Sequence, residues 1–146
     1  MKRFIAVLLL LLVLCLSGCD EMLSQRKADR DMVENFLFLL GNDIEEAKTL
    51  LHPNFYEESG EFDTFIEDFE SKYNVDFSKG MSIYGICGIS SGNVKYLDSD
   101  YSYTYSEFSY NIVIGTKSFS VYIQTITDEY GSGIYRFEKL NNQMDD

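Results

Sequence analysis

The sequence has few of the residues from which most metal and catalytic sites are built. Its 146 residues contain one histidine, His52, three cysteines, one proline and no tryptophan. Tight transition-metal sites usually combine several His and Cys side chains, and the chain contains no cluster of them. We therefore expect no metal and no cofactor, and this scarcity also weakens most catalytic interpretations.

Basic residues are scarce as well. The chain has 12 Lys and Arg against 24 Asp and Glu, which gives a formal net charge of −12 at pH 7. A surface of this sign repels the phosphate backbone of nucleic acids and the headgroups of anionic lipids. The charge excludes nucleic acid as a partner, and it excludes adsorption of the whole surface to an anionic membrane.

The chain opens with a positively charged segment followed by a strongly apolar one. Lys2 and Arg3 follow Met1, and residues 4–16 are apolar without interruption. An apolar run of this length suits a signal peptide but is shorter than the roughly 20 residues that a membrane-spanning helix needs. We expect the segment to be removed from the mature protein.

The residues that end this segment, Leu16-Ser17-Gly18-Cys19, resemble the lipobox of bacterial lipoproteins. The resemblance implies removal of residues 1–18, a lipid on the sulfur of Cys19, and attachment to the cell membrane on its extracytoplasmic side. Residues 19–27 would then be a short tether. The alternative is an uncleaved anchor, or a secretory signal followed by an accidental cysteine.

Only one cysteine is left for the folded domain. Cys15 lies in the segment to be removed and Cys19 carries the lipid, so Cys87 has no partner for an intramolecular disulfide. A lone thiol outside the cytoplasm is either packed or reactive. Because residues 83–89 around it are mostly apolar, we expect Cys87 to lie in the core.

Three segments in the first half have helical periodicity. In residues 28–40 apolar side chains recur at helical spacing up to Gly41, a typical helix end. Asp43 suits the cap of a second helix, which we expect to end at His52 because Pro53 disfavours helical geometry in the residue before it. A third helix follows, and its apolar stripe is the clearest in the chain. The stripe consists of Phe62, Phe65, Ile66, Phe69 and Tyr73.

From residue 81 onward the apolar period falls to about two, which predicts strands. The expected strands are residues 81–89, 94–97, 101–114, 118–127 and 133–140. In the longest of them the apolar phase changes near Ser106 and Glu107, which predicts a bulge or a bend. Helices followed by strands predict an α+β fold, with about three helices packed on one side of a curved antiparallel sheet of four to five strands. We expect one domain over residues 28–140 and a frayed tail over residues 141–146.

A short motif spans the predicted second helix. It runs from Leu40-Gly41-Asn42-Asp43-Ile44 through Ala47 to Leu50-Leu51-His52-Pro53 and Phe55. With the third helix and the hairpins after it, the motif resembles small lipoproteins of the nuclear transport factor 2-like, or cystatin-like, superfamily. The resemblance implies a cone-like roll whose curved sheet is filled by the helices. Cyclase and isomerase branches of this superfamily use an Asp or His inside the cone, but no matching motif occurs here and we assign no catalytic residue.

Two patterns that can carry chemistry fail in their context. Residues 88–92 match the G-x-S-x-G motif of hydrolases, but no helix is expected after Ser90 and the only histidine precedes it. We interpret this segment as a glycine-rich turn between strands. Residues 98–102 begin like a calcium loop, but positions six and twelve are Tyr103 and Ser109. An EF-hand is thus excluded, and a weak irregular calcium site is the alternative.

Acidic pairs and His52 are the remaining groups that can transfer protons. A general acid or base usually needs a partly buried environment that shifts its pKa. The pairs Glu57-Glu58, Glu67-Asp68 and Asp128-Glu129 fall on predicted solvent-exposed faces and turns, so we interpret them as surface residues. We expect His52, at a helix end, to hydrogen-bond to a nearby carbonyl, with proton transfer as the alternative.

Tyr101, Tyr103 and Tyr105 alternate with hydroxyl side chains along one predicted strand. Tyrosine suits both a half-exposed sheet face and a binding surface. These residues either pack as an ordinary sheet face or face a ligand, which would be a peptide, a glycan or a second copy in a homodimer. We predict a non-catalytic binding or interaction domain of unknown protein or small ligand. The alternative is a small enzyme of isomerase or cyclase type with an inward acid or base.

Overall fold

The computed structural model describes residues 23–56, 61–95 and 101–140. The helices are the N-terminal helix (described over residues 23–40), α2 (Ile44–Lys48) and α3 (Phe62–Tyr73), with a short 3₁₀ helix at Phe77–Lys79. The strands are β1 (Leu51–Tyr56), β2 (Met81–Lys95), β3 (Ser102–Ile114), β4 (Lys117–Asp128) and β5 (Gly131–Lys139). The predicted α+β fold, with helices packed against one sheet, is confirmed.

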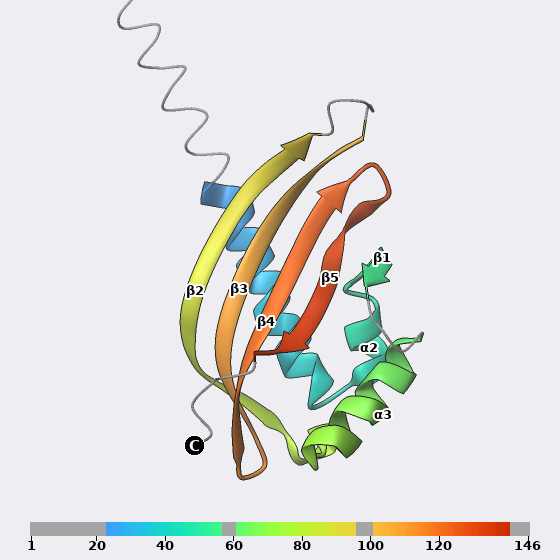
Figure 1. The fold of residues 1–146 in the computed structure, drawn as a ribbon, viewed down its shortest axis with the longest axis vertical. Helices are drawn as coiled ribbons and strands as arrows, with labels where there is room; N and C mark the ends of the chain where they lie inside the picture. Colours follow the sequence, from blue (N-terminus) through green and yellow to red (C-terminus); the bar gives the residue numbers. More distant parts are fainter. Residues whose placement is uncertain (1–22, 57–60, 96–100, 141–146) are drawn as a thin grey trace, which may run out of the picture.

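The sheet is a single curved layer with the strand order β1-β5-β4-β3-β2, and it is not closed. Figure 1 shows the N-terminal helix behind this layer, with α2 and α3 on the β5 side. We call the face covered by the N-terminal helix the inner face and the opposite one the outer face. β2, β3, β4 and β5 pair as antiparallel neighbours, whereas β1 pairs in parallel with β5. The sheet is therefore mixed, with an unpredicted parallel strand at one edge.

Strand β1 occupies a segment that we expected to complete the second helix. α2 ends at Lys48, so the prediction that this helix reaches His52 was wrong. Pro53 does favour an extended backbone at His52, as expected. The extended residues, however, form a strand of the sheet and do not follow directly on a helix. The Ile134 amide donates to the Leu50 carbonyl at 2.8 Å, just before the strand begins.

The other helix predictions agree with the structure in their main features. The N-terminal helix ends at residue 40, before Gly41, but it already includes residues 23–27, which we expected to be part of the tether. Asp43 caps α2, since its Oδ1 accepts the Glu46 amide at 3.0 Å. Within the described residues, no helix has the length and apolar character needed to span a membrane.

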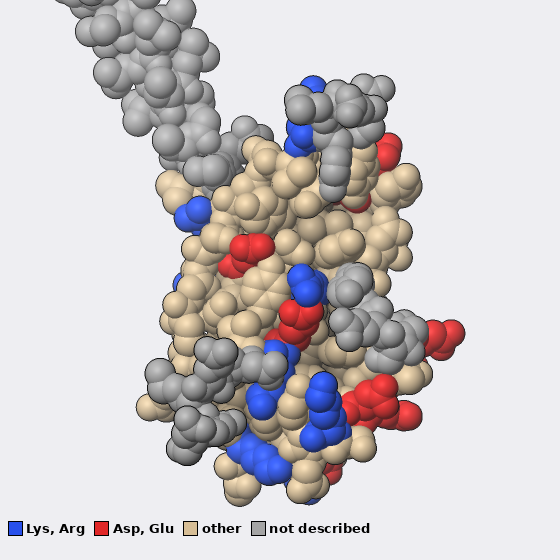
Figure 2. Space-filling model, viewed as in Figure 1, with Lys and Arg blue, Asp and Glu red and all other residues tan. Residues whose placement is uncertain are grey.

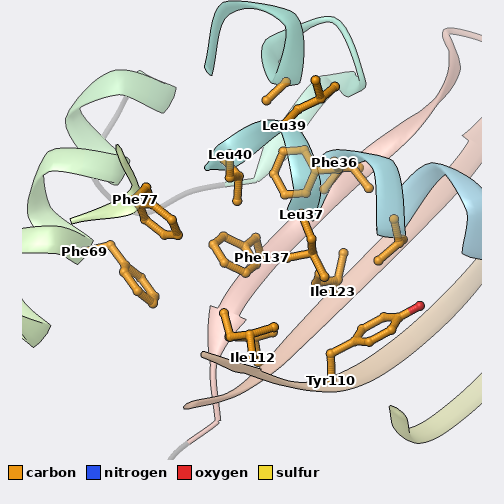
Figure 3. Packing of buried hydrophobic residues seen from close by; sticks show 14 of the residues in the cluster. Phe36, Leu37, Leu39, Leu40, Phe69, Phe77, Tyr110, Ile112, Ile123 and Phe137 are labelled. Atoms are coloured by element: carbon orange, nitrogen blue, oxygen red, sulfur yellow. The ribbon is translucent and has the colours of Figure 1, made fainter. Parts of the chain in front are cut away.

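The core lies between the inner face of the sheet and the helices (Figure 3). Side chains of the N-terminal helix point toward β3, β4 and β5. Figure 3 labels Phe36, Leu37, Leu39 and Leu40 of this helix, and facing them Tyr110, Ile112, Ile123 and Phe137 of the strands. The ring of Phe69 in α3 stacks on Phe137 with centroids 5.7 Å apart, and Phe77 lies 5.6 Å from Phe69. The predicted stripe of α3 therefore joins this helix to the sheet.

β2 is one strand of 15 residues, where two short strands were predicted. Residues 88–92, which we interpreted as a turn, lie inside it. Its register against β3 skips Tyr84 and Cys87, which are bulged. Both side chains are exposed, so the prediction of a buried Cys87 was wrong. The prediction rested on the apolar neighbours of Cys87, but the bulge places its side chain toward solvent.

Of the predicted bulge or bend near Ser106 and Glu107, the bulge was wrong, because the register of β3 with β4 is continuous from Thr104 to Ile114. The apolar residues change face there while the backbone alternation continues. Before this point the large side chains lie on the outer face, and from Phe108 onward they lie on the inner face. The change in sequence pattern thus marks a change in which face is apolar.

Candidate functional site

The three tyrosines lie in a row on the outer face, in the phase opposite to the core residues of β3. The ring centroids of Tyr101 and Tyr103 are 5.9 Å apart, and those of Tyr103 and Tyr105 are 6.4 Å apart. Ile126 is the register partner of Tyr105 and is only 4% exposed, although it is not part of the main core cluster. The tyrosine row and Ile126 therefore form a small apolar patch on the outer face, separate from the main core.

Gly92 of β2 supports this row from the neighbouring strand. It is the register partner of Tyr105, and a Cβ atom at Gly92 would lie 2.9 to 3.1 Å from three atoms of the Tyr105 ring. Any larger residue would displace the ring, because Cβ atoms do not approach other atoms so closely. The second glycine of the G-x-S-x-G pattern is thus explained by packing.

An open groove of about 550 Å³ lies at the end of the sheet where β2 stops, β3 starts and β4 turns into β5. It is lined by residues 93–95, 101–104 and 127–129, which include Tyr101 and Tyr103. Most of this lining is hydroxyl, amide or aromatic, and its charged members are Lys95, Asp128 and Glu129. We call it the tyrosine groove. Its chemistry suits a ligand that is held by ring contacts and hydrogen bonds.

One wall of the tyrosine groove is fixed by a buried hydrogen-bond network. Asp128 Oδ1 lies 3.1 Å from His52 Nε2, and both side chains are fully buried. Asp128 Oδ2 accepts the Tyr101 hydroxyl at 2.8 Å. The backbone amides of Tyr130 and Gly131 also donate to Oδ1, at 2.8 and 3.2 Å. A single carboxylate thus joins β1, the start of β3 and the β4–β5 turn.

The partners of His52 define its tautomer. Its Nδ1 accepts the Asn54 amide at 3.0 Å, so the proton of the neutral ring is on Nε2 and is donated to Asp128. Both nitrogens are used and the ring has no solvent access. His52 therefore has no free nitrogen to offer a substrate. The expected bond to a carbonyl was wrong, since the partner is a carboxylate.

The network also fixes the charge state of its members. Burial alone would raise the pKa of Asp128, but hydrogen bonds from Tyr101, the Tyr130 amide and His52 outweigh it and hold this pKa below its usual value. The bond to Asp128, together with burial, raises the pKa of Tyr101 to about 12. At neutral pH the carboxylate is charged and the phenol keeps its proton.

The acidic pairs divide between surface and interior. Glu67 and Asp68 are exposed, as predicted, and so is Glu129. Asp128 was wrongly placed on the surface, because its side chain is fully buried. Glu57-Glu58 and the calcium-like residues 98–100 lie outside the described residues. In the described parts of the chain, no group of three or more His, Cys, Asp and Glu side chains is arranged to hold a metal ion.

The hydrolase-like motif does not form a nucleophile site. Ser90 lies in the middle of β2, exposed, and no helix follows it. Its hydroxyl donates to Glu107 Oε2 at 2.6 Å, while the histidine is already bonded to Asp128. A serine without a histidine base and without the strand-to-helix turn does not match the activated nucleophile of this motif. Ser90 is a polar surface residue of the sheet.

Sequence reasoning also missed a second buried acid. Asp29 of the N-terminal helix is 4% exposed and lies against the inner face, where it accepts the hydroxyl of Ser106. Its other oxygen accepts Gln25 Nε2 at 2.8 Å. A signal was present in the sequence, because Asp29 stands four residues before Val33, on the apolar stripe of that helix. Asp29 is the inward acid of this domain.

No family model, no curated protein and no solved structure matches this chain.

Proposed function

We propose that this chain is a bacterial lipoprotein whose single α+β domain binds a ligand in the tyrosine groove without catalysing a reaction. The lipobox Leu16-Ser17-Gly18-Cys19 supports attachment through a lipid on Cys19, at the extracytoplasmic side of the cell membrane. The binding role rests on the groove. Its single strongest support is the contact between the Tyr101 hydroxyl and the buried carboxylate of Asp128.

That contact matters because it fixes a wall of the groove before any ligand arrives. Asp128 is fully buried and accepts four hydrogen bonds, so Tyr101 is held by a rigid partner. The Tyr103 ring in turn lies beside the Tyr101 ring, tilted by 46° with centroids 5.9 Å apart. A preformed aromatic wall loses little conformational entropy on binding, which favours affinity. Ring faces and neighbouring hydroxyls suit a neutral polar ligand, such as a short glycan or peptide.

The buried acid Asp29 is the observation that favours the enzyme alternative, an isomerase or cyclase with an inward acid. Both of its oxygens are already bonded within the protein, to Gln25 and Ser106. It is also absent from the lining of the tyrosine groove. A general acid or base has to reach its substrate. The binding role is therefore the better supported of the two.

The anchor is tested at its sulfur. Cys19→Ser, or inhibition of lipoprotein signal peptidase, should leave an unprocessed precursor that keeps residues 1–18, and mass spectrometry of the membrane fraction measures this. Ser17→Ala, which keeps a small residue in the lipobox, is the control and should be processed normally. Release of a soluble mature form from the Cys19→Ser chain would contradict the lipoprotein assignment.

The groove is tested with panels of short neutral oligosaccharides and uncharged peptides, added to the detergent-solubilised protein and followed by NMR. A compound that binds should shift the resonances of Tyr101 and Tyr103 first, and Tyr103→Ser should abolish the effect. Tyr84→Ser is the matched control, since Tyr84 is 84% exposed on β2 and lies outside the groove. Binding that survives Tyr103→Ser would rule out the groove as the site.

A further inference from the structure

Three lysines contact Tyr73, two over its ring and one at its carbonyl, at the opposite end of the sheet from the tyrosine groove. Lys139 Nζ lies 4.6 Å from the ring centroid of Tyr73, at the end of α3, and Lys72 Nζ lies 5.5 Å from the same centroid. Lys117 Nζ donates to the Tyr73 carbonyl at 2.9 Å. We call Lys72, Lys117 and Lys139 the lysine cluster. Figure 2 shows basic side chains gathered in the lower part of this view, near the ends of α3 and β5.

No lysine of the cluster has an acidic partner within 4.0 Å among the described residues, a property that it shares with Arg26, Lys27 and Lys95, but only in the cluster do three such residues contact one side chain or its carbonyl. Elsewhere Arg30, Lys48, Lys79 and Arg136 each lie within 4.0 Å of a carboxylate. No such pair involves a lysine of the cluster, although the chain has twice as many acids as bases. Three like charges in one place repel one another, so this arrangement lowers the stability of the folded state.

Structural roles account for the cluster only in part. Lys117 satisfies a carbonyl at the end of α3, and cations are favourable at a helix C-terminus. That bond uses one of the three N–H groups of its ammonium. Lys72 and Lys139 are placed over the Tyr73 ring, and Lys139 also lies 5.5 Å from the Phe119 ring. Such contacts orient an ammonium while leaving its donors available.

We propose that the lysine cluster binds a phosphate group of an anionic ligand. Three ammonium groups whose N–H donors are not all used suit an anion that has several acceptor oxygens and about two negative charges, as a phosphate group has. Lysine binds phosphate well because its ammonium acts as a compact point charge. A planar carboxylate would favour the fork of an arginine, but Arg136 is paired with Glu138. Neighbouring acids, drawn red beside the cluster in Figure 2, would repel a long polyanion. The ligand is therefore compact, either a soluble phosphate ester or a phospholipid headgroup.

The test is calorimetric titration of the full chain, in non-ionic detergent at low ionic strength, with inorganic triphosphate as the probe. Lys72→Gln/Lys139→Gln should bind at least about tenfold more weakly, because two charge-assisted contacts are lost. Lys72→Arg/Lys139→Arg, which keeps the charge, should retain most of the affinity. Lys27→Gln/Lys48→Gln changes the net charge by the same amount away from the cluster and should bind as the original protein does. Melting temperatures of all variants show whether folding is preserved.

Adding phosphatidylglycerol to the micelles distinguishes the two sources of phosphate. If the ligand is a lipid headgroup, this lipid weakens triphosphate binding by competition, whereas phosphatidylcholine does so much less. If the ligand is soluble, neither lipid changes the affinity. The proposal is overturned if triphosphate does not bind, or if both glutamine double variants weaken it equally. The cluster shares no residue with the tyrosine groove, so either proposal can fail while the other holds.

Discussion

The two faces of the sheet have opposite chemistry although the same strands build both. On the inner face β3 contributes Phe108, Tyr110, Ile112 and Ile114, which are fully buried or nearly so. On the outer face the alternate residues of the same strand are two tyrosines, Glu107, Ser109, Asn111 and Val113, and these are half-buried. The inner face is built for stability, while the outer face retains side chains that can bind. The residues that stabilise the fold and the residues that can bind a ligand therefore lie on opposite faces of the same strand.

The two faces also differ in the contacts that order their side chains. The inner face is covered by aromatic rings from the helices, such as Phe36 and Phe69. Among the described residues no helix lies on the outer face, and the order of this face comes from hydrogen bonds to the carboxylates of Asp128 and Glu107. Truncation should be most costly on the inner face, whereas on the outer face the buried carboxylate should matter more for stability than the exposed side chains do.

The largest effect is expected on the inner side. Phe69→Ala should lower the free energy of unfolding by about 3 to 5 kcal/mol, because it leaves a cavity where one ring contacts several others. The rings of Tyr73, Phe77, Phe119 and Phe137 all lie within 6.3 Å of it, centroid to centroid. Urea unfolding measures the change. Glu67→Ala, on the exposed side of α3, should change it by only about 0.5 kcal/mol, and equal effects would mean that α3 does not dock.

The next largest effect is expected at the carboxylate that orders the outer face. Asp128→Ala leaves the Tyr101 hydroxyl, His52 and two backbone amides without their acceptor. Burying unsatisfied donors should lower the free energy of unfolding by about 2 kcal/mol or more. Glu129→Ala, next in the chain and exposed, is the control. If both variants unfold at the same urea concentration, the network does not hold the groove wall.

A smaller and pH-dependent effect should follow from the charge of Asp128. Its pKa is lower in the folded protein than in the unfolded chain, so its contribution to stability is complete above about pH 4 and is lost as pH falls through the folded value. The difference in unfolding free energy between the original protein and Asp128→Asn should therefore shrink as pH is lowered from 7 to 3. A difference that stays constant would show that the charge of Asp128 is not stabilised by its donors.

The smallest effect is expected at Ser90, on the exposed side of the sheet. Ser90→Ala removes one exposed hydrogen bond to Glu107 and should change the free energy of unfolding by less than about 0.5 kcal/mol. A fluorophosphonate probe should not label the original protein, because Ser90 has no histidine base. Labelling detected by mass spectrometry at Ser90 would restore the hydrolase interpretation.

Local patterns predicted the parts of the fold that depend on neighbours in sequence. The stripe from Phe62 to Tyr73 marks α3 correctly because helical contacts repeat every three to four residues. The shared phase of the three tyrosines, likewise, follows from strand alternation. The glycine-rich part of β2 was misread as a turn, since Gly92 is set by the Tyr105 ring on the next strand.

Contacts between distant residues could not be predicted in the same way. His52 and Asp128 are 76 positions apart, and each looks like an ordinary surface residue in its own segment. Strand β1 is six residues long and contains a proline, which is a weak strand signal. Both features depend on β1 lying beside β5. The lysine cluster is similar, because its members come from α3, β4 and β5.

The parallel pairing of β1 with β5 also constrains the order in which the domain can fold. Leu51 is a partner of Ile134, so the contact closes a very long loop, and contacts of high sequence separation form late and slowly. During synthesis β1 has no partner until the last strand has been made. Under the proposed export, the N-terminus crosses the membrane while the final edge of the sheet is still missing. The topology itself would then delay folding until passage is nearly complete.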